Sequence, residues 1–145
     1  MKKLVIVVSG VSNRGKTKSI KKVVDLLQKK YPEGELSKSL QPTLTVDILH
    51  IFTVGNVKIG IASQGDSRDK LEEFFNKLIQ AGSEIIVCAC HTPTSATYRF
   101  IDALDRQKYD VVFIEKIGVV ENERDSSNEA TANEILSLIH NRLKP

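Results

Sequence analysis

The chain has 145 residues, a length typical of one domain, so we expect residues 1–145 to form a single domain. Its 41% hydrophobic and 27% charged residues are ordinary for a globular protein, and a net charge of +3 is too small to argue for nucleic acid as a partner. Neither a secretory signal nor a stretch of membrane-spanning length is visible, so we expect a cytoplasmic protein with Cys88 and Cys90 reduced.

The first predicted elements are a strand and a helix joined by a glycine-rich turn. Residues 4–8 form an apolar run of strand length, and apolar residues then recur with helical spacing, which predicts a helix over 15–30. Between them, residues 10–17 read GVSNRGKT and match the pattern G-x-x-x-x-G-K-T. In such a turn the backbone N–H groups point at phosphate oxygens beside a helix N-terminus. Gly10 and Gly15 would allow backbone angles and close approaches that a side chain obstructs.

This turn resembles the Walker A motif of the P-loop NTPase superfamily. The resemblance implies a nucleoside triphosphate as ligand and Mg²⁺ as cofactor. It implies that Lys16 reaches the β- and γ-phosphates and that the Thr17 hydroxyl binds Mg²⁺. Arg14 is a candidate for offsetting charge on the transferred phosphoryl group, with a plain surface role as the alternative. The further phosphate-contacting residues expected in the motif are Gly10, Ser12, Asn13, Gly15 and Lys18.

Two strands are predicted over 45–52 and 56–62, after a polar loop at 33–43. The turn between them is so short that they must pair antiparallel, as a hairpin. In the GTPase branch of the superfamily such a hairpin places its second strand beside the P-loop strand, whereas another strand intervenes in the RecA-like branch. The hairpin therefore favours a GTPase-like layout.

Helices and strands alternate in the second half of the chain. We expect helices over 68–81 and 95–106, strands over 84–90 and 111–114, and a last helix that begins at a capping box in residues 126–129. This alternation predicts the α/β class, as a three-layer α/β/α fold with about five strands, mostly parallel. The expected strand order is 2-3-1-4-5, with an antiparallel hairpin strand at the edge. The ligand is expected at the carboxyl ends of the parallel strands.

Phosphoryl transfer also needs a carboxylate near the metal and a group that positions the attacking oxygen. At the end of the strand over 56–62, Gln64 would orient water, Gly65 would donate its N–H to the γ-phosphate, and Asp66 would bind Mg²⁺ or act as a base. The alternative is that Asp66 or Ser67 caps the next helix, and the D-x-x-G order of GTPases is not matched.

Two other acids lie near predicted strands. Glu115 follows the apolar run 111–114 and resembles the acid of a Walker B strand. Asp47 falls inside the hairpin, on one face with Leu49 and Ile51, and is interpreted as an edge-strand charge.

The remaining candidates have structural interpretations beside the functional ones. Cys88, Cys90 and His91 suggest a metal, but zinc sites need about four ligands, and the cysteines fit better as small buried residues of a strand. The segment 91–95 should border the ligand pocket, although Thr94 or Ser95 also suits a helix cap. Three arginines are either phosphate-binding or surface residues: Arg68, Arg99 and Arg106.

These patterns leave two functions open. The first is Mg²⁺-ATP-dependent phosphoryl transfer, by an NTPase or a small kinase, to water or a small-molecule acceptor. The second is a nucleotide-dependent switch or binding module with little turnover, which acts through a protein partner by changing loops 33–43 and 63–68. Residues 76–79 begin like the guanine-binding N-K-x-D motif but lack its aspartate, so ATP is expected rather than GTP.

Overall fold

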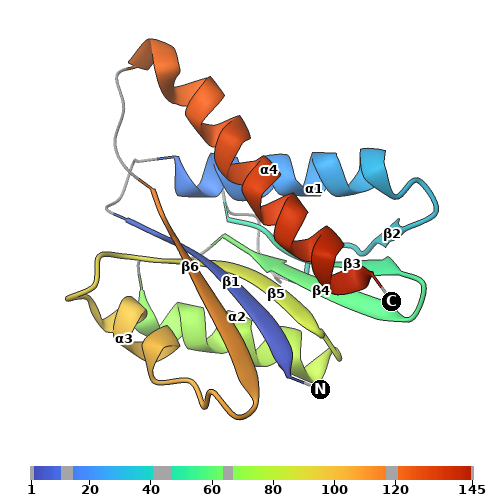
Figure 1. Ribbon diagram of the computed structural model, residues 1–145. Helices are drawn as coiled ribbons and strands as arrows, with labels where there is room; N and C mark the ends of the chain where they lie inside the picture. The colour runs from blue at the N-terminus through green and yellow to red at the C-terminus, as the bar shows by residue number, and fades with distance from the viewer. Residues whose placement is uncertain (1, 11–14, 41–46, 64–66, 117–120, 145) are drawn as a thin grey trace.

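A six-stranded sheet runs through the middle of the molecule, with helices on both sides (Figure 1). The computed structural model describes residues 2–10, 15–40, 47–63, 67–116 and 121–144. The strands are β1 (Lys3–Ser9), β2 (Glu35–Leu36), β3 (Leu49–Val54), β4 (Val57–Ala62), β5 (Ile85–Cys90) and β6 (Tyr109–Glu115). The helices are α1 (Lys16–Lys30), α2 (Arg68–Gln80), α3 (Ala96–Asp102) and α4 (Arg124–Leu143), with a 3₁₀ turn at Glu121–Glu123 before α4.

The strand order is β2-β3-β4-β5-β1-β6. Strands β4, β5, β1 and β6 run parallel, and β3 pairs antiparallel with β4 in the predicted hairpin, so the α/β class with a mostly parallel sheet is confirmed. The predicted order 2-3-1-4-5 is wrong, because β5 lies between β4 and β1. A short turn dictates only that β3 pairs with β4. The next neighbour of β4 follows from the α2 crossover, which returns the chain beside the strand that it left. The GTPase-like layout that we inferred from the hairpin is therefore also wrong.

A sixth strand lies where a polar loop was expected. β2 pairs antiparallel with β3, with Leu36 opposite Phe52. Beyond β2 the chain keeps following β3, since the N–H groups of Ser37 and Leu40 donate to the carbonyl oxygens of Ile51 and Leu49. A two-residue strand is too short to show an alternation of apolar and polar residues. The polar residues at 33–43 therefore gave no indication of this pairing.

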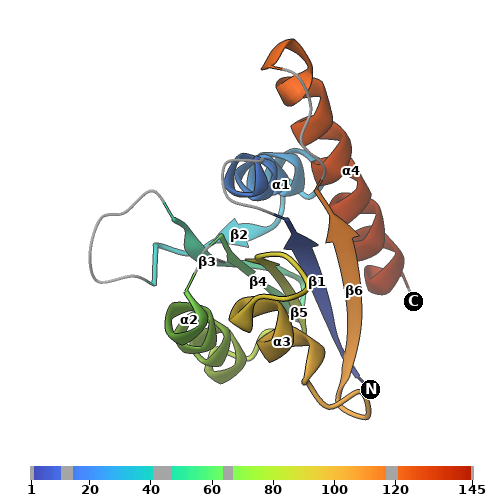
Figure 2. The same cartoon turned by 90° about the vertical axis from the view of Figure 1, so that its left-hand side faces the viewer.

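The helices form two layers. α1 and α4 cover one face of the sheet, and α2 and α3 cover the other (Figure 2). Every residue of β5 is buried, and successive side chains alternate between the two cores. Cys88 and Cys90 are free and share the α2/α3 face, where burial raises the pKa of both thiols, that of Cys90 to about 12. These thiols are thus held protonated as packing groups.

Two helix boundaries differ from the sequence prediction. α3 ends at Asp102 rather than near 106, and α4 begins at Arg124, ahead of the expected capping box at 126–129. The box does not cap the helix because α4 already contains Ser126, so the Ser126 hydroxyl has no helix end to cap. The two residues in the middle of the box have tertiary partners instead: Ser127 accepts a hydrogen bond from Lys116, and Asn128 is buried against α1.

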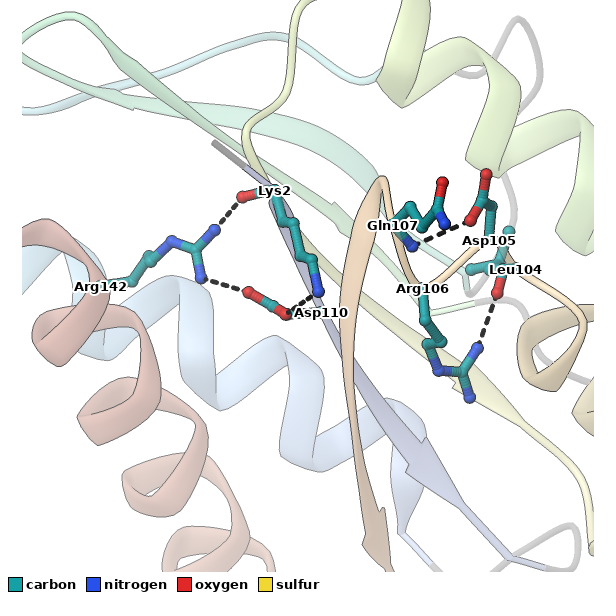
Figure 3. Close-up of polar contacts among 7 residues, drawn as sticks. All are labelled: Lys2, Leu104, Asp105, Arg106, Gln107, Asp110 and Arg142. Carbon is teal, nitrogen blue, oxygen red and sulfur yellow. Dashed lines mark hydrogen bonds and ion pairs between the residues drawn. The ribbon is translucent and has the colours of Figure 1, made fainter.

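At the amino ends of the strands, three charged residues tie the last helix to the sheet (Figure 3). Arg142 of α4 donates to the Asp110 carboxylate at 3.0 Å and to the carbonyl oxygen of Lys2. The Lys2 ammonium lies 3.6 Å from the other Asp110 oxygen. The hydrogen bond from Arg142, helped by the charge of Lys2, holds the pKa of Asp110 below its usual range.

We expect Asp110→Asn to cause a small loss of thermal stability at neutral pH that disappears in acid. A carboxyl group whose pKa is lowered by folding stabilises the protein above its ordinary pKa, and this contribution is lost as the pH falls below about 4. Melting temperatures of wild type and variant between pH 7 and pH 3 check this. Asp25→Asn, at an exposed site on α1, controls for the change of net charge. A difference in melting temperature between wild type and Asp110→Asn that stays constant with pH would contradict the prediction.

Candidate functional site

The carboxyl ends of β4, β5, β1 and β6 lie along one edge of the sheet. The chain leaves this edge at Ser9, the last residue of β1, and re-enters regular structure at Lys16, the first residue of α1. The predicted order of strand, glycine turn and helix is therefore confirmed on both sides of the turn. Residues 11–14 lie outside the described residues, and with them Ser12, Asn13 and Arg14.

Lys16 is buried at this edge, with 7% of its surface exposed. Its ammonium donates to the carbonyl oxygen of Gly10 at 2.7 Å and to that of Cys90 at 3.0 Å. These two carbonyls belong to the ends of neighbouring strands, because Cys90 is the residue opposite Ser9 in the sheet. The positive charge of Lys16 is thus fixed between β1 and β5, at the start of α1.

The N-terminus of α1 has the features that favour an anion. No side chain of the described residues caps it, and its first turn contains no acidic residue. The first amide groups of a helix lack intrahelical acceptors and carry the positive end of the helix dipole. Beside them, the Thr17 side chain is half-buried and Lys18 is exposed. A negatively charged group would therefore be stabilised in front of Lys16 and Thr17.

Both motif glycines make close approaches, and the neighbours are protein atoms of the β6–α4 side. Gly15 has φ of 87°, in the left-handed region that favours glycine, and a Cβ there would overlap with Oδ1 of Asn128. A Cβ on Gly10 would lie 2.8 Å from the carbonyl oxygen of Lys116. The sequence predicted that glycine was needed at both positions but gave no sign of these partners, which lie more than 100 residues away along the chain.

The candidates that follow β4 come next. Gln64, Gly65 and Asp66 lie outside the described residues, directly after Ser63 at the end of β4. Ser67 is the N-cap of α2 and accepts a hydrogen bond from the N–H of Lys70 at 3.4 Å. The capping role considered for Asp66 or Ser67 thus belongs to Ser67.

Asp47 is not the edge-strand charge that we expected. β3 begins only at Leu49, and Asp47 accepts a hydrogen bond from the buried Ser63 hydroxyl at 3.1 Å. The same hydroxyl accepts from the N–H of Ile48 at 2.8 Å, so Asp47 is fixed where β4 ends. Its carboxylate therefore belongs to the carboxyl edge of the sheet, although β5 separates β4 from β1.

Glu115 is exposed and ends β6 directly opposite Ser9, one residue before Gly10. Its neighbour Ile114 belongs to the α1/α4 core, so the alternation of the strand directs Glu115 to the α2/α3 side. Of Asp47 and Glu115, Glu115 is the one next to β1.

The segment after β5 completes the edge. The N–H of His91 donates to Thr97 at 2.8 Å, and Ser95 caps α3 by accepting from the N–H of Tyr98 at 3.1 Å. Arg99 is exposed on α3 and donates to the carbonyl oxygen of Ser95. Of the two candidates Thr94 and Ser95, it is Ser95 that serves as the helix cap.

Two other candidate arginines have local partners. Arg68 lies 3.8 Å from Glu72 on α2, and Arg106 lies 3.1 Å from Asp102. Arg106 is outside α3, in the connection that leads to the amino end of β6, away from the carboxyl edge. A phosphate-binding role for Arg106 at the glycine turn is thus incompatible with its position.

Comparisons of this chain with protein-family models, with curated proteins and with solved structures found no match. Within the part of the chain that the structure describes, no three His, Cys, Asp or Glu side chains group in a way that would hold a metal ion. Over the same residues, no helix combines the length and the apolar character that crossing a membrane requires.

Proposed function

We propose that the chain binds a nucleoside triphosphate together with Mg²⁺ at residues 10–17 and catalyses phosphoryl transfer, to water or to a small-molecule acceptor. The observation that carries the proposal is the position of Lys16. Its buried ammonium is fixed by two backbone carbonyls, at 2.7 and 3.0 Å, beside a helix N-terminus without a side-chain cap. A cation and a set of amide donors at one point are the elements that bind a polyphosphate.

The proposed roles follow from this centre. Lys16 contacts the β- and γ-phosphates, and the amides of the turn from Gly10 to Lys18, including Ser12 and Asn13, surround them. Thr17 holds Mg²⁺, with Asp66 or Glu115 as the supporting carboxylate, and the bound metal would neutralise charge on the phosphoryl oxygens. Gln64 and Gly65 orient the attacking oxygen and the γ-phosphate, and Arg14 offsets developing charge.

We propose ATP rather than GTP as the nucleotide, because the guanine-binding motif is incomplete at residues 76–79. The strand order supports the same choice, because the layout that favoured a GTPase is absent. β5 lies between the hairpin and β1, which is the arrangement expected of the RecA-like branch. The two buried, free thiols suit the reducing cytoplasm that we propose as the location of the protein.

The contacts of Gly10 and Gly15 favour a second candidate function, a nucleotide-dependent switch with little turnover that acts through a protein partner. Because these glycines lie against Lys116 and Asn128, a change in the turn would reach α4. Measured turnover separates the two candidates, since the enzyme would hydrolyse or transfer phosphate and the switch would only bind.

Calorimetric titration of ATP and GTP, with and without Mg²⁺, tests the proposal on wild type, Lys16→Ala and Lys21→Ala. Lys21 is an exposed lysine of the same helix and serves as the matched control. We expect Mg²⁺-dependent ATP binding in wild type and Lys21→Ala, weakened at least about tenfold in Lys16→Ala because a charge-assisted contact to phosphate is lost. Absence of binding by both nucleotides to the wild type, or undiminished binding by a folded Lys16→Ala, would overturn it.

A further inference from the structure

A cluster of polar side chains, all buried except the half-buried Ser127, lies where β6, α1 and α4 meet, inside a layer that is otherwise apolar. Its members are Ser19 of α1, Lys116 just after β6, and Ser127, Asn128 and Thr131 of α4. Ser19 is fully buried, Asn128 is 2% exposed and Lys116 is 5% exposed. Elsewhere α4 packs on this layer through aliphatic residues such as Ala132, Ile135 and Ile139.

Lys116 connects this cluster to the end of β1. Its ammonium donates to the hydroxyls of Ser127 at 2.7 Å and Thr131 at 3.1 Å. Its backbone N–H donates to the carbonyl oxygen of Ser9 at 2.7 Å, and its own carbonyl oxygen lies against Gly10. One residue therefore holds both the first glycine of the turn and the second turn of α4.

Asn128 makes the corresponding contact at the other end of the turn. Its Oδ1 atom lies directly against Gly15 and accepts a hydrogen bond from the Ser19 hydroxyl at 3.3 Å. The two glycines that bound the turn are thus both in contact with the unit formed by β6 and α4. α4 lies across α1 on this face of the sheet (Figure 1).

This arrangement is a costly way to pack two helices. Burying an ammonium among hydroxyl acceptors costs free energy that an apolar side chain of similar size would not, and burial lowers the pKa of Lys116. What this arrangement adds is a fixed position, since close contacts at both glycines, together with the hydrogen bonds of Lys116 to Ser9 and of Ser19 to Asn128, define where the turn lies relative to α4. A phosphate site needs such definition, because its amide donors must be held within about 0.5 Å of the productive geometry.

We propose that Lys116 and Asn128 are positioning residues for the phosphate-binding turn, and that they couple its occupancy to α4. This inference rests on the proposed nucleotide site at residues 10–17. If the contacts at Gly10 and Gly15 set the affinity for phosphate, nucleotide binding must stabilise the same contacts by an equal free energy, because coupling between two sites is reciprocal. α4 is then the element through which the bound nucleotide is sensed.

The first test compares Asn128→Ala and Lys116→Met with Asn133→Ala, which changes an exposed asparagine on the same helix. We expect the two cluster variants to bind Mg²⁺-ATP about tenfold more weakly than wild type, within the usual range of coupling between sites, and Asn133→Ala to bind equally well. In hydrogen exchange, Mg²⁺-ATP should slow the amides of residues 127–131 in wild type and Asn133→Ala, and leave them unchanged in Asn128→Ala.

A double variant distinguishes positioning from general packing. Gly15→Ala should lose binding for two reasons, because φ of 87° disfavours alanine and because the new Cβ meets Asn128. Adding Asn128→Ala should restore only the part due to the second reason, by removing the obstructing atom. The same Asn128→Ala change would then weaken Mg²⁺-ATP binding in the wild-type protein and strengthen it in the Gly15→Ala variant. A residue that only supports the fold would weaken binding in both.

The outcomes separate this inference from the proposed function. No binding of ATP or GTP by the wild type would remove the nucleotide site itself. The inference would be overturned, and the proposed function left standing, if the folded cluster variants bound nucleotide normally and hydrogen exchange in α4 were the same with and without nucleotide. Where Lys116→Met does not fold, Thr131→Val removes one acceptor of the same ammonium at nearly constant shape and is judged by the same criteria.

Discussion

Replacing Phe52 by alanine is expected to lower the free energy of unfolding by about 3–5 kcal/mol, the usual cost of truncating a buried aromatic residue. Phe52 is fully buried in β3, and its ring lies directly against Gly34, in the turn before β2. The cavity would open between the hairpin and the α1/α4 layer, where the ring belongs to the same core as α1 and α4. A loss of this size is a large part of the stability of an ordinary domain.

Urea unfolding of wild type, Phe52→Ala and Phe113→Ala checks this prediction. Phe113 is half-buried on the edge strand β6, where its ring stacks on Tyr98 at 4.4 Å between ring centroids, so its removal leaves a site that solvent can fill. We expect Phe113→Ala to cost clearly less than Phe52→Ala, with similar denaturant dependence for the three proteins. An equal or larger cost at Phe113 would mean that β6 is more completely covered than this fold indicates.

Local patterns predicted the elements whose signal lies within one segment. The helix expected over 68–81 is α2, Arg68–Gln80, and the residues that it buries, Leu71, Phe74, Phe75 and Leu78, recur with helical spacing. The hairpin of β3 and β4 and the glycine turn between β1 and α1 were found in the same way. Each depends on a turn or a periodicity that a dozen residues carry.

Relations between distant segments were not predicted. The strand Ile85–Cys90 is apolar throughout, which indicates a central strand but not which neighbours it has. Its position between β4 and β1 follows from the packing of the α2 crossover, and no residue of β5 encodes that choice alone. The order 2-3-1-4-5 therefore failed at β5 and β1, two apolar strands whose sequences were compatible with either layout.

The candidate site shows the same difference between residues that a local pattern indicates and residues that only the fold brings together. The motif itself indicated Gly10, Gly15, Lys16 and Thr17, because the chemistry of the turn is contained in consecutive residues. Lys116 and Asn128 were missed, although a lysine directly after an apolar strand was a usable signal. Residues 126–129 matched a capping box, and this local interpretation obscured the tertiary contacts of Ser127 with Lys116 and of Asn128 with Gly15.

Replacing Thr17 by valine is expected to abolish the effect of Mg²⁺ on ATP affinity while leaving the fold intact. Thr17 is half-buried in the first turn of α1, and valine keeps its shape and has a similar helix propensity, so the melting temperature should change little. What valine lacks is the hydroxyl oxygen that would bind the metal. Turnover, if the wild type shows it, should fall at least about 100-fold, because metal ions stabilise charge on phosphoryl oxygens by several kcal/mol.

Thr17→Ser is the matched control, because it keeps the hydroxyl and loses only a methyl group. Titrations of ATP with Mg²⁺ and with EDTA should give a metal-dependent affinity in wild type and Thr17→Ser, and equal affinities under both conditions in Thr17→Val. The comparison isolates a single oxygen atom at constant backbone geometry. If Thr17→Val kept its response to Mg²⁺, the metal would have to be held without α1, and the carboxylates of Glu115 and Asp66 would become its primary ligands.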